Sequence, residues 1–324
     1  MEQKVRARAV RDAKKHYSMR IRKLLQEEKQ STRVLYEEMF YEDSKEFVDY
    51  YYEEKTKDNE IYVMGDPPVS MVQLNPYQMI VNSNEVLTHY IVAVATKPEF
   101  RRKGCMSALL KISMEEMRKR KEPFTFLMPA KEEYYTPFGF TTVYQQDLLY
   151  VDIQTYEGEE VKDYERQAVL ANENLASSYQ IYAKRSSSYY ERLAKEYGCE
   201  GGKLLKATKE VSGQRCIPAV KEVPEEAGKI MIRILDVKRM LEQIKAKKDL
   251  SLRVYVDDFL IPENEGVYEI RAREGEFLQV RSVKEEEEVR VTIEELQQVL
   301  FGKKERKIFS KIEPLTRIYL NEIV

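Results

Sequence analysis

The segment from residue 91 to residue 107 constrains this chain more than any other, because an apolar strand runs directly into a basic turn and then into a helix. The strand has β-branched or small residues from Ile91 to Val94, and the turn contains Arg101, Arg102 and Gly104. A glycine lets the backbone approach a ligand closely, and the first N–H groups of a helix attract an anion. The pattern predicts a mixed α/β fold in which this turn binds a diphosphate.

The turn differs from the two common nucleotide-binding loops. It lacks the Gly-Lys-Ser/Thr ending of a P-loop and the three spaced glycines of a dinucleotide-binding fold. The pattern Arg-x-x-Gly-x-small after a strand resembles instead the pyrophosphate loop of the GNAT acetyltransferase superfamily, which binds coenzyme A. Met106 stands where most of these loops have Gly or Ala, a change that the Eis-like (enhanced intracellular survival) branch tolerates. A solvated basic turn between a strand and a helix stays open as the alternative.

Composition limits the classes of protein to which the chain can belong. Its 324 residues are enough for two or three domains, and 43% hydrophobic with 34% charged residues is typical of a soluble globular protein. The formal net charge of −2 argues against a nucleic-acid partner. No apolar segment is long enough to span a membrane, and no hydrophobic signal core follows Met1, so we expect a cytoplasmic protein without a membrane partner.

Cysteine and histidine are too scarce to suggest a metal centre. The three cysteines, Cys105, Cys199 and Cys216, are unevenly spaced, and His16 and His89 are the only histidines. This set favours neither a disulfide framework nor a metal knuckle, so we expect no metal. Tyrosine is abundant at 23 residues and tryptophan is absent, so an aromatic pocket would be built largely from phenol rings.

Hydrophobic periodicity predicts helices first, then a run of strands, the strand–turn–helix unit, and a second run of strands towards the C-terminus. The expected helices are 4–29, 32–39, 43–52, 105–120, 164–175, 178–182, 187–197, 237–245 and 292–300. The expected strands are 61–64, 69–74, 79–81, 86–94, 124–128, 140–144, 203–208, 230–235, 251–256, 266–271 and 277–282. This order is typical of the mixed α/β class.

Most of the chain resembles the Eis-like acetyltransferases. The motifs that carry this resemblance are Tyr90–Thr96, Arg101–Gly104, Tyr134–Phe140, Met231–Val237, Phe259–Asn264 and Tyr319–Val324. The resemblance implies an α/β (α+β) protein with a GNAT acyltransferase fold and a C-terminal sterol-carrier-protein-like domain. The expected division is an N-terminal helical extension (1–30), a GNAT domain (31–150), a shortened, degenerate second GNAT-like region (151–228) and the sterol-carrier-like domain (229–324).

The resemblance also implies a homo-oligomer, since members of the family often assemble as hexamers. The middle region, residues 151–228, is too short for a complete second GNAT-like domain. If that domain helps to form the assembly, the hexamer is in doubt here, so we weigh a smaller oligomer equally.

Acetyl-CoA is the co-substrate that the resemblance implies. In the family, backbone groups of a parted strand hold the pantetheine arm, and the basic turn holds the diphosphate. The residues implied to contact the cofactor are Val94, Ala95, Thr96, Arg101, Arg102, Lys103, Gly104, Cys105, Met106, Ser107, Ala130 and Lys131.

Two catalytic roles follow from the same resemblance. Tyr135 falls on the family's tyrosine that protonates the departing thiolate, and an unperturbed phenol pKa of about 10 makes this transfer nearly balanced. The family's base is its terminal carboxylate, here on Val324, and the apolar ending is consistent with a buried tail. The alternatives are Tyr134 or Tyr135 as ordinary core aromatics, an edge strand of the last domain for the tail, and Glu322 as the base.

The expected acceptor is a primary amine of a small cationic molecule, of the polyamine or aminoglycoside type. Glu42, Asp43 and Glu46, before the triplet Tyr50–Tyr52, are candidates to supply negative charge and ring faces for such a cation, although each acid is also a plausible solvated helix residue. Two other functions stay open: a non-catalytic acyl-CoA sensor or carrier of an apolar ligand, and an acetyltransferase for protein lysines or N-termini.

Overall fold

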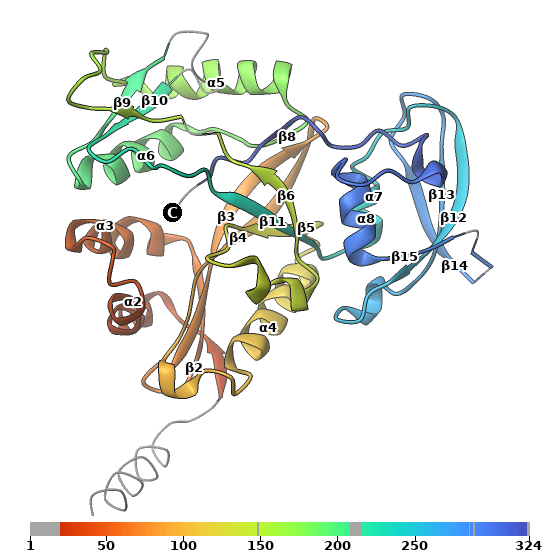
Figure 1. The fold of residues 1–324 in the computed structure, drawn as a ribbon, viewed down its shortest axis with the longest axis horizontal. Helices are drawn as coiled ribbons and strands as arrows, with labels where there is room; N and C mark the ends of the chain where they lie inside the picture. Colours follow the sequence, from red (N-terminus) through yellow and green to blue (C-terminus); the bar gives the residue numbers. More distant parts are fainter. Residues whose placement is uncertain (1–19, 148, 208–215, 285, 288, 323–324) are drawn as a thin grey trace, which may run out of the picture. The chain divides into compact units, whose positions relative to one another are not determined.

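The strands that position the predicted turn belong to two units of the chain (Figure 1). This computed structural model describes residues 20–147, 149–207, 216–284, 286–287 and 289–322. The first unit comprises residues 1–75 and 91–113, and the second comprises residues 76–90 and 114–324. Three elements contribute residues to both units: β3 (Ser70–Val81), β4 (Asn84–Thr96) and α4 (Cys105–Lys119).

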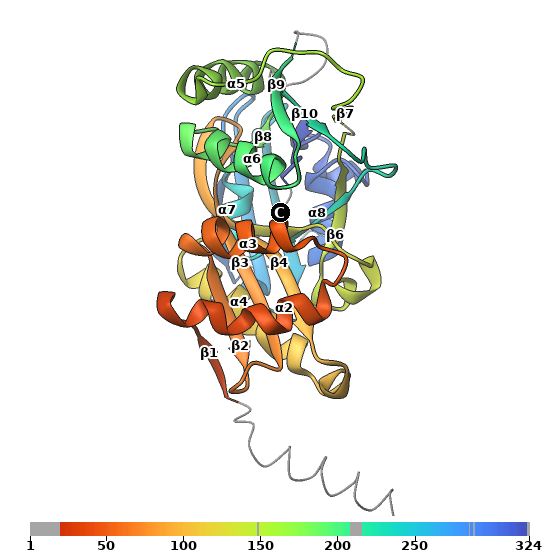
Figure 2. The same cartoon turned by 90° about the vertical axis from the view of Figure 1, so that its left-hand side faces the viewer.

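The first unit contains an antiparallel meander, and α2 (Arg33–Met39) and α3 (Lys45–Glu54) lie on one face of it, as Figures 1 and 2 show. Its other elements are β1 (Ile21–Lys23), η1 (Gln26–Thr32), η2 (Lys55–Lys57), β2 (Glu60–Met64) and η3 (Pro98–Phe100). β2 pairs with β1 and with β3, antiparallel to both. Ser44 accepts a hydrogen bond from the Phe47 N–H at 3.1 Å and so begins α3, as the sequence predicts. The Tyr51 hydroxyl donates to Gln73 Oε1 at 3.0 Å and joins α3 to β3.

The helix predicted over residues 4–29 lies mostly outside the described residues; it is wrong for residues 21–23, whereas residues 26–29 lie in the short helix η1. Residues 21–23 form β1, because their backbone groups pair with the edge of β2. The tyrosine triplet is also placed differently from the expectation. Tyr50, Tyr51 and Tyr52 are buried in the core of this unit, so their rings are not available to a substrate.

One set of strands in the second unit joins distant parts of the chain. The elements up to the tail are β5 (Phe124–Leu127), η4 (Glu132–Tyr134), η5 (Thr136–Phe138), β6 (Thr141–Gln145), α5 (Tyr164–Ser178), β8 (Ile181–Ala183), α6 (Ser187–Cys199), β11 (Lys229–Ile234) and β16 (Ile318–Tyr319). β4 and β5 pair in parallel at Tyr90 and Phe126, and β11 lies between β5 and β6, antiparallel to both. The second half of β3 pairs with β8, which pairs in parallel with β16.

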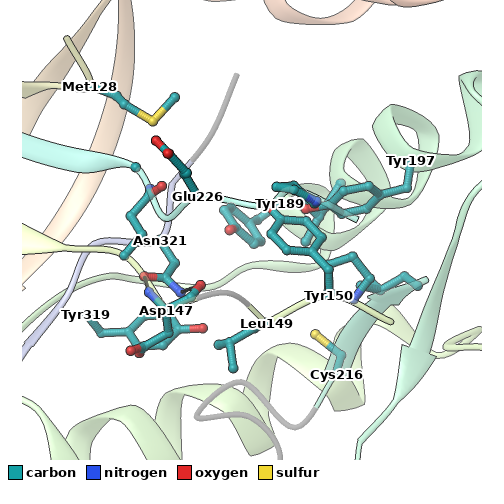
Figure 3. A pocket seen from close by; sticks show the side chains of 16 residues that line it. Met128, Asp147, Leu149, Tyr150, Tyr189, Tyr197, Cys216, Glu226, Tyr319 and Asn321 are labelled. Carbon is teal, nitrogen blue, oxygen red and sulfur yellow. Dashed lines mark hydrogen bonds between the residues drawn. The ribbon is translucent and has the colours of Figure 1, made fainter. Parts of the chain in front are cut away.

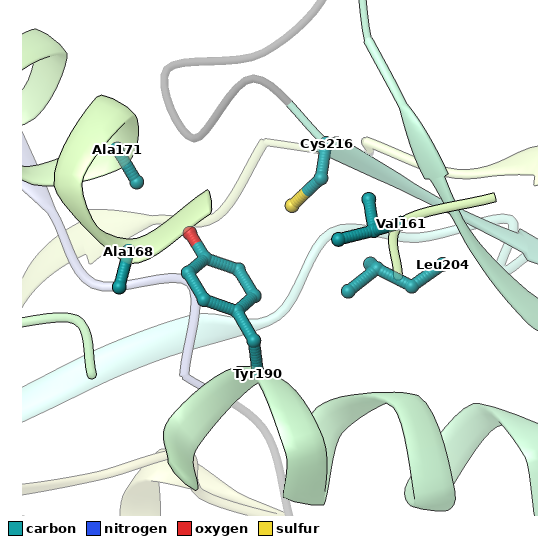
Figure 4. Packing of buried hydrophobic residues seen from close by; sticks show 6 residues of the cluster. All are labelled: Val161, Ala168, Ala171, Tyr190, Leu204 and Cys216. Atoms are coloured by element: carbon teal, nitrogen blue, oxygen red, sulfur yellow. The ribbon is translucent and has the colours of Figure 1, made fainter. Parts of the chain in front are cut away.

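The middle of the chain adds a small sheet of its own. Its strands, in the spatial order β7-β10-β9, are β7 (Val151–Asp152), β10 (Cys216–Val220) and β9 (Lys203–Lys206). Figure 4 shows the apolar cluster between these strands and the helices α5 and α6. The cluster consists of Val161, Ala168, Ala171, Tyr190, Leu204 and Cys216.

The last part of the chain folds as an α+β layer. A four-stranded sheet in the order β14-β13-β12-β15 carries α7 (Val237–Leu241) and α8 (Ile293–Leu300) beside it (Figure 1). Its strands are β12 (Leu250–Asp257), β13 (Gly266–Ala272), β14 (Gln279–Val283) and β15 (Val289–Thr292), and the short helices η6 (Pro262–Asn264) and η7 (Lys307–Phe309) complete this part.

The helix expected over 178–182 is wrong, because α5 ends at Ser178 and residues 181–183 form β8 between β3 and β16. The strand that starts at residue 229, where we expect the last domain to begin, is β11, which pairs with β5 and β6. Residues 230–234 of β11 are all buried.

Candidate functional site

The predicted diphosphate turn lies in the first unit between β4 and α4. Arg101, Arg102, Lys103 and Gly104 are exposed, whereas Cys105 at the start of α4 is buried. Gly104 has a φ of +80°, and a Cβ built there would meet no atom within 4 Å. Its backbone conformation therefore favours glycine, while the space beside it stays open for a ligand.

Hydrogen bonds fix the path of the chain before this turn. Arg101 Nε donates to the Thr96 carbonyl at 3.1 Å, and Lys103 Nζ donates to the Glu99 carbonyl. Ala93 has a φ of +48°, so β4 is irregular directly before the residues expected to contact the pantetheine arm. The side chains of Arg101 and Lys103 are thus each held by a backbone carbonyl, and the regular backbone of β4 is interrupted at Ala93, before the turn.

The remaining predicted cofactor residues of the first unit are less exposed. Ala95 is buried, and its carbonyl accepts a hydrogen bond from the Ser70 hydroxyl at 2.9 Å. Val94, Thr96, Met106 and Ser107 are half-buried. These positions flank the exposed turn on both sides.

The acidic candidates for the acceptor also lie in the first unit. Glu42 and Glu46 are exposed. Asp43 already accepts a hydrogen bond from the Tyr36 hydroxyl at 2.8 Å, so part of its capacity is engaged in the protein. Their role as substrate ligands stays a prediction.

The predicted acid, Tyr135, lies in the second unit between η4 and η5. It is 8% exposed, and its ring packs edge-to-face on Phe140 with 5.9 Å between the centroids. Burial raises the pKa of Tyr135 to about 12. The phenol is therefore a weaker acid than the unperturbed tyrosine assumed from the sequence. Ala130 and Lys131, predicted to face the cofactor, are exposed in the segment between β5 and η4.

The turn that follows Tyr135 is held from outside its own segment. Arg233 Nε on β11 donates to the Phe138 carbonyl at 2.9 Å. Gln297 Nε2 on α8 donates to the Gly139 carbonyl at 2.9 Å, and the Gln297 Oε1 accepts from the Ile234 N–H at 2.7 Å. Both supporting residues are fully buried, so the backbone around the phenol has little freedom to move.

The C-terminal tail is buried, as its apolar sequence predicts. Residues 318 and 319 form β16 beside β8, so the expectation of an edge strand within the last domain is wrong. Gln146 Nε2 donates to the carbonyls of Leu320 and Glu322, each at 3.1 Å. Val324, the predicted base, lies outside the described residues.

A buried ion pair holds the tail at Glu322. Arg185 Nη2 lies 2.9 Å from Glu322 Oε1, and the two side chains are 0% and 1% exposed. The Tyr189 hydroxyl donates to Glu322 Oε2 at 2.9 Å, and the guanidinium lies 4.3 Å from the centroid of the Tyr189 ring. Burial by itself lowers the pKa of Arg185, but the Glu322 carboxylate together with the neighbouring tyrosines outweighs burial and holds that pKa well above its usual value.

Tyr90 on β4 is buried in the second unit. Burial raises the pKa of Tyr90 above its usual value, a backbone hydrogen bond at Met128 opposes this rise, and the negative charge of Glu322 adds to it.

A cavity of about 190 Å³ opens beside the tail in the second unit (Figure 3). It is lined by Met128, Gln146, Asp147, Leu149, Tyr150, Tyr189, Leu193, Tyr197, Leu204, Cys216, Pro218, Pro224, Glu226, Gly228, Tyr319 and Asn321. A Cβ at Gly228 would lie 2.4 Å from Met128 Sδ and 2.5 Å from Gln146 Oε1, so a side chain there would displace the ends of these two flexible side chains. We name this cavity the tyrosine pocket.

Sequence reasoning missed Arg185, Gln146 and Tyr189. Nothing in their local sequence distinguishes them from surface polar residues. The signal that the sequence offers is the predicted burial of the tail, because a buried tail must contact other residues.

Among the described residues, no group of three or more His, Cys, Asp or Glu side chains is placed to hold a metal ion. Within the same part of the chain, the helices are too short or too polar to cross a membrane.

Two protein-family models match parts of the chain. Residues 9–143 match the family model of the acetyltransferase (GNAT) domain, and residues 237–317 match that of the sterol carrier protein domain. The first match contains the basic turn and Tyr135, and the second contains Gln297. No curated protein matches the chain.

Solved structures share the fold over most of the chain. A protein from Enterococcus faecalis described as a probable N-acyltransferase is 15% identical, with a TM-score of 0.68 over 91% of this chain and 93% of that one. A GCN5-related N-acetyltransferase from Anabaena variabilis is 16% identical, with a TM-score of 0.65 over 94% and 98% of the two chains. Eis1 from Mycobacterium abscessus is 12% identical, with a TM-score of 0.61 over 87% and 89%.

Proposed function

We propose that this chain, which matches the acetyltransferase (GNAT) domain over residues 9–143 and the sterol carrier protein domain over residues 237–317, transfers an acetyl group from acetyl-CoA to a primary amine of a small cationic molecule, of the polyamine or aminoglycoside type. The observation that carries the proposal is the exposed basic turn, in which Gly104 adopts a φ of +80° directly before α4. This turn lies within the matched acetyltransferase domain. We further propose a cytoplasmic homo-oligomer, either a hexamer or a smaller assembly.

The residues of the turn fit the diphosphate of coenzyme A. The open space at Gly104 allows close approach, the first N–H groups of α4 supply donors, and Arg101 and Arg102 supply charge. Each charge-assisted hydrogen bond from these arginines contributes about 1.5–3 kcal/mol if it is shielded from water. The backbone of residues 94–96, together with Ala130 and Lys131, contacts the rest of the cofactor in this proposal.

In the proposed reaction, the neutral amine attacks the thioester carbonyl of acetyl-CoA, an amide bond forms and the carbon–sulfur bond breaks. Tyr135 donates its hydroxyl proton to the departing thiolate, and a base takes the excess proton from the amine nitrogen. We assign the base to the Val324 carboxylate. Glu322 is the weaker candidate, because Arg185 and Tyr189 already engage both of its oxygens.

The test is acetyl-CoA-dependent thiol release with polyamines, aminoglycosides and lysine peptides, measured on the native chain, on Tyr135→Phe, and on a chain extended by a few residues after Val324. The proposal expects turnover of a small amine that falls sharply in both variants while acetyl-CoA binding persists. Equal turnover in the native and extended chains removes Val324 from the mechanism. Tight acetyl-CoA binding without turnover of any amine refutes the enzymatic function.

A further inference from the structure

The tyrosine pocket presents aromatic faces more than hydroxyl groups. Tyr150 and Tyr197 hydrogen-bond to each other, with their rings edge-to-face at 6.4 Å, and the Tyr189 hydroxyl donates to Glu322. Burial raises the pKa of Tyr150 and Tyr197, so both phenols stay neutral at physiological pH. Because these hydroxyls are occupied within the protein, what remains for a ligand is largely ring surface.

The opposite side of the pocket carries negative charge. Figure 3 shows Asp147 and Glu226 across the cavity from Tyr150, Tyr189 and Tyr197. Both carboxylates are exposed, and none of the described residues that line the cavity is a lysine or an arginine. The nearby Arg185 is neutralised by Glu322. Ring faces opposite carboxylates are the arrangement that attracts an organic cation.

The size of the pocket restricts this cation. The cavity has a volume of about 190 Å³. Pockets for drug-sized ligands run from about 300 to about 1,000 Å³. The cavity therefore encloses an amine with one small ring or a short chain more completely than it encloses a molecule of several linked sugar rings.

The pocket also lies beside the C-terminal tail of this unit. Tyr319 and Asn321 of the tail form part of its lining, so the described end of the tail is one of its walls. Met128 lines it as well, and the backbone of Met128 hydrogen-bonds to Tyr90. A ligand in the pocket would therefore contact the tail that leads to the proposed base.

We propose that the tyrosine pocket binds the acceptor, and that the acceptor is a compact amine with an apolar, aromatic body instead of an aminoglycoside. The ring of the amine packs against Tyr150 and Tyr197, and its ammonium group is attracted by Asp147 and Glu226 before it loses its proton. This inference rests on the proposed acetyltransferase function and assigns to it a primary amine of another class, an aromatic one.

The experiment measures binding by calorimetry and acetyl transfer by thiol release, with 2-phenylethylamine as the probe. The neutral analogue 2-phenylethanol, spermidine and kanamycin are the comparison compounds. We expect 2-phenylethylamine to bind at least tenfold more tightly than 2-phenylethanol and to be acetylated with a higher kcat/KM than kanamycin. A higher kcat/KM for kanamycin overturns the inference.

Variants locate the binding in the pocket. Asp147→Asn combined with Glu226→Gln is expected to weaken 2-phenylethylamine binding at least tenfold, whereas Glu225→Gln, a change at an exposed neighbour outside the lining, leaves it unaltered. Tyr150→Leu is expected to weaken it similarly, with Tyr156→Leu as the matched control outside the lining. Thermal melts of all four variants show whether each one is folded.

The outcomes separate the two proposals. Acetylation of 2-phenylethylamine that the pocket variants leave unchanged overturns the pocket assignment but keeps the acetyltransferase. Binding of 2-phenylethylamine that the pocket variants weaken, without acetylation of any amine, overturns the proposed function and supports the pocket as a cation site.

Discussion

Removing the Glu322 carboxylate is expected to destabilise the second unit strongly. Arg185 and Glu322 are 0% and 1% exposed and lie 2.9 Å apart, so Glu322→Ala leaves a guanidinium buried without its counter-charge. Breaking a buried pair by deleting one partner costs about 3–5 kcal/mol. The Tyr189 hydroxyl loses its acceptor in the same variant, which places the expected loss in the upper part of this range.

The assay is equilibrium unfolding in urea followed by circular dichroism. With a denaturant slope of roughly 3 kcal/mol/M, the loss corresponds to a midpoint lower by about 1–2 M. The matched control is Glu191→Ala on α6, which breaks the exposed pair with Lys195 at 3.1 Å and should change the free energy of unfolding by about 0.5 kcal/mol or less.

A double variant tests the cause of the destabilisation. Arg185→Met with Glu322→Leu removes both charges and keeps apolar volume in the site, so it is expected to recover most of the stability that Glu322→Ala loses. If the free energy of unfolding of Glu322→Ala lies within about 1 kcal/mol of that of the native chain, the ion pair does not hold the tail, and the argument from burial is refuted.

Four further outcomes are expected. Tyr135→Phe should lower kcat by about 10²–10⁴-fold in thiol-release assays without changing the acetyl-CoA Kd measured by calorimetry. Because burial raises the pKa of Tyr135 from the usual value of about 10 to about 12, its contribution to stability is complete below pH 10 and is lost as the pH rises to about 12, which a urea series at alkaline pH should show. Gly104→Ala meets no atom within 4 Å, so it should cost only about 1 kcal/mol of stability through its positive φ, yet weaken acetyl-CoA binding at least several-fold in calorimetry. Gln297→Leu removes the support of the Gly139 carbonyl and should cost about 1–3 kcal/mol in urea unfolding and lower kcat more than it raises the acetyl-CoA KM; an unchanged kcat would contradict its positioning role.

Local signals were sufficient to predict the basic turn and the helices around it. Gly104 has the positive φ that its place between a strand and a helix suggests, and Ser44 begins α3 through its own side chain. Both features depend on residues within a few positions of each other, which is the range over which sequence patterns are informative.

The surroundings of the tail could not be predicted in the same way. Tyr189 and Glu322 are 133 positions apart in the sequence, and Gln146 and Leu320 are 174 apart. An apolar ending predicts burial but does not identify the partner. The same limit explains β8, whose three residues become a strand only because β3 and β16 lie on either side of it. The burial of Tyr50, Tyr51 and Tyr52 could not be predicted for a related reason. It depends on how α3 packs against the core, and hydrophobic periodicity does not show this packing.

The turn after Tyr135 lies in the acetyltransferase match, but one of the side chains that hold it belongs to the sterol carrier protein match. Gln297 belongs to the sterol carrier protein match, yet its side chain binds the Gly139 carbonyl and the Thr141 hydroxyl, both within the acetyltransferase match. Arg233 on β11 adds a bond to the Phe138 carbonyl and an ion pair at 2.5 Å with Asp258. Since these donors are buried, the turn that carries the phenol cannot relax without disturbing the last domain. The sterol carrier protein domain therefore acts here as a structural support for the proposed acid, whether or not it binds a ligand of its own.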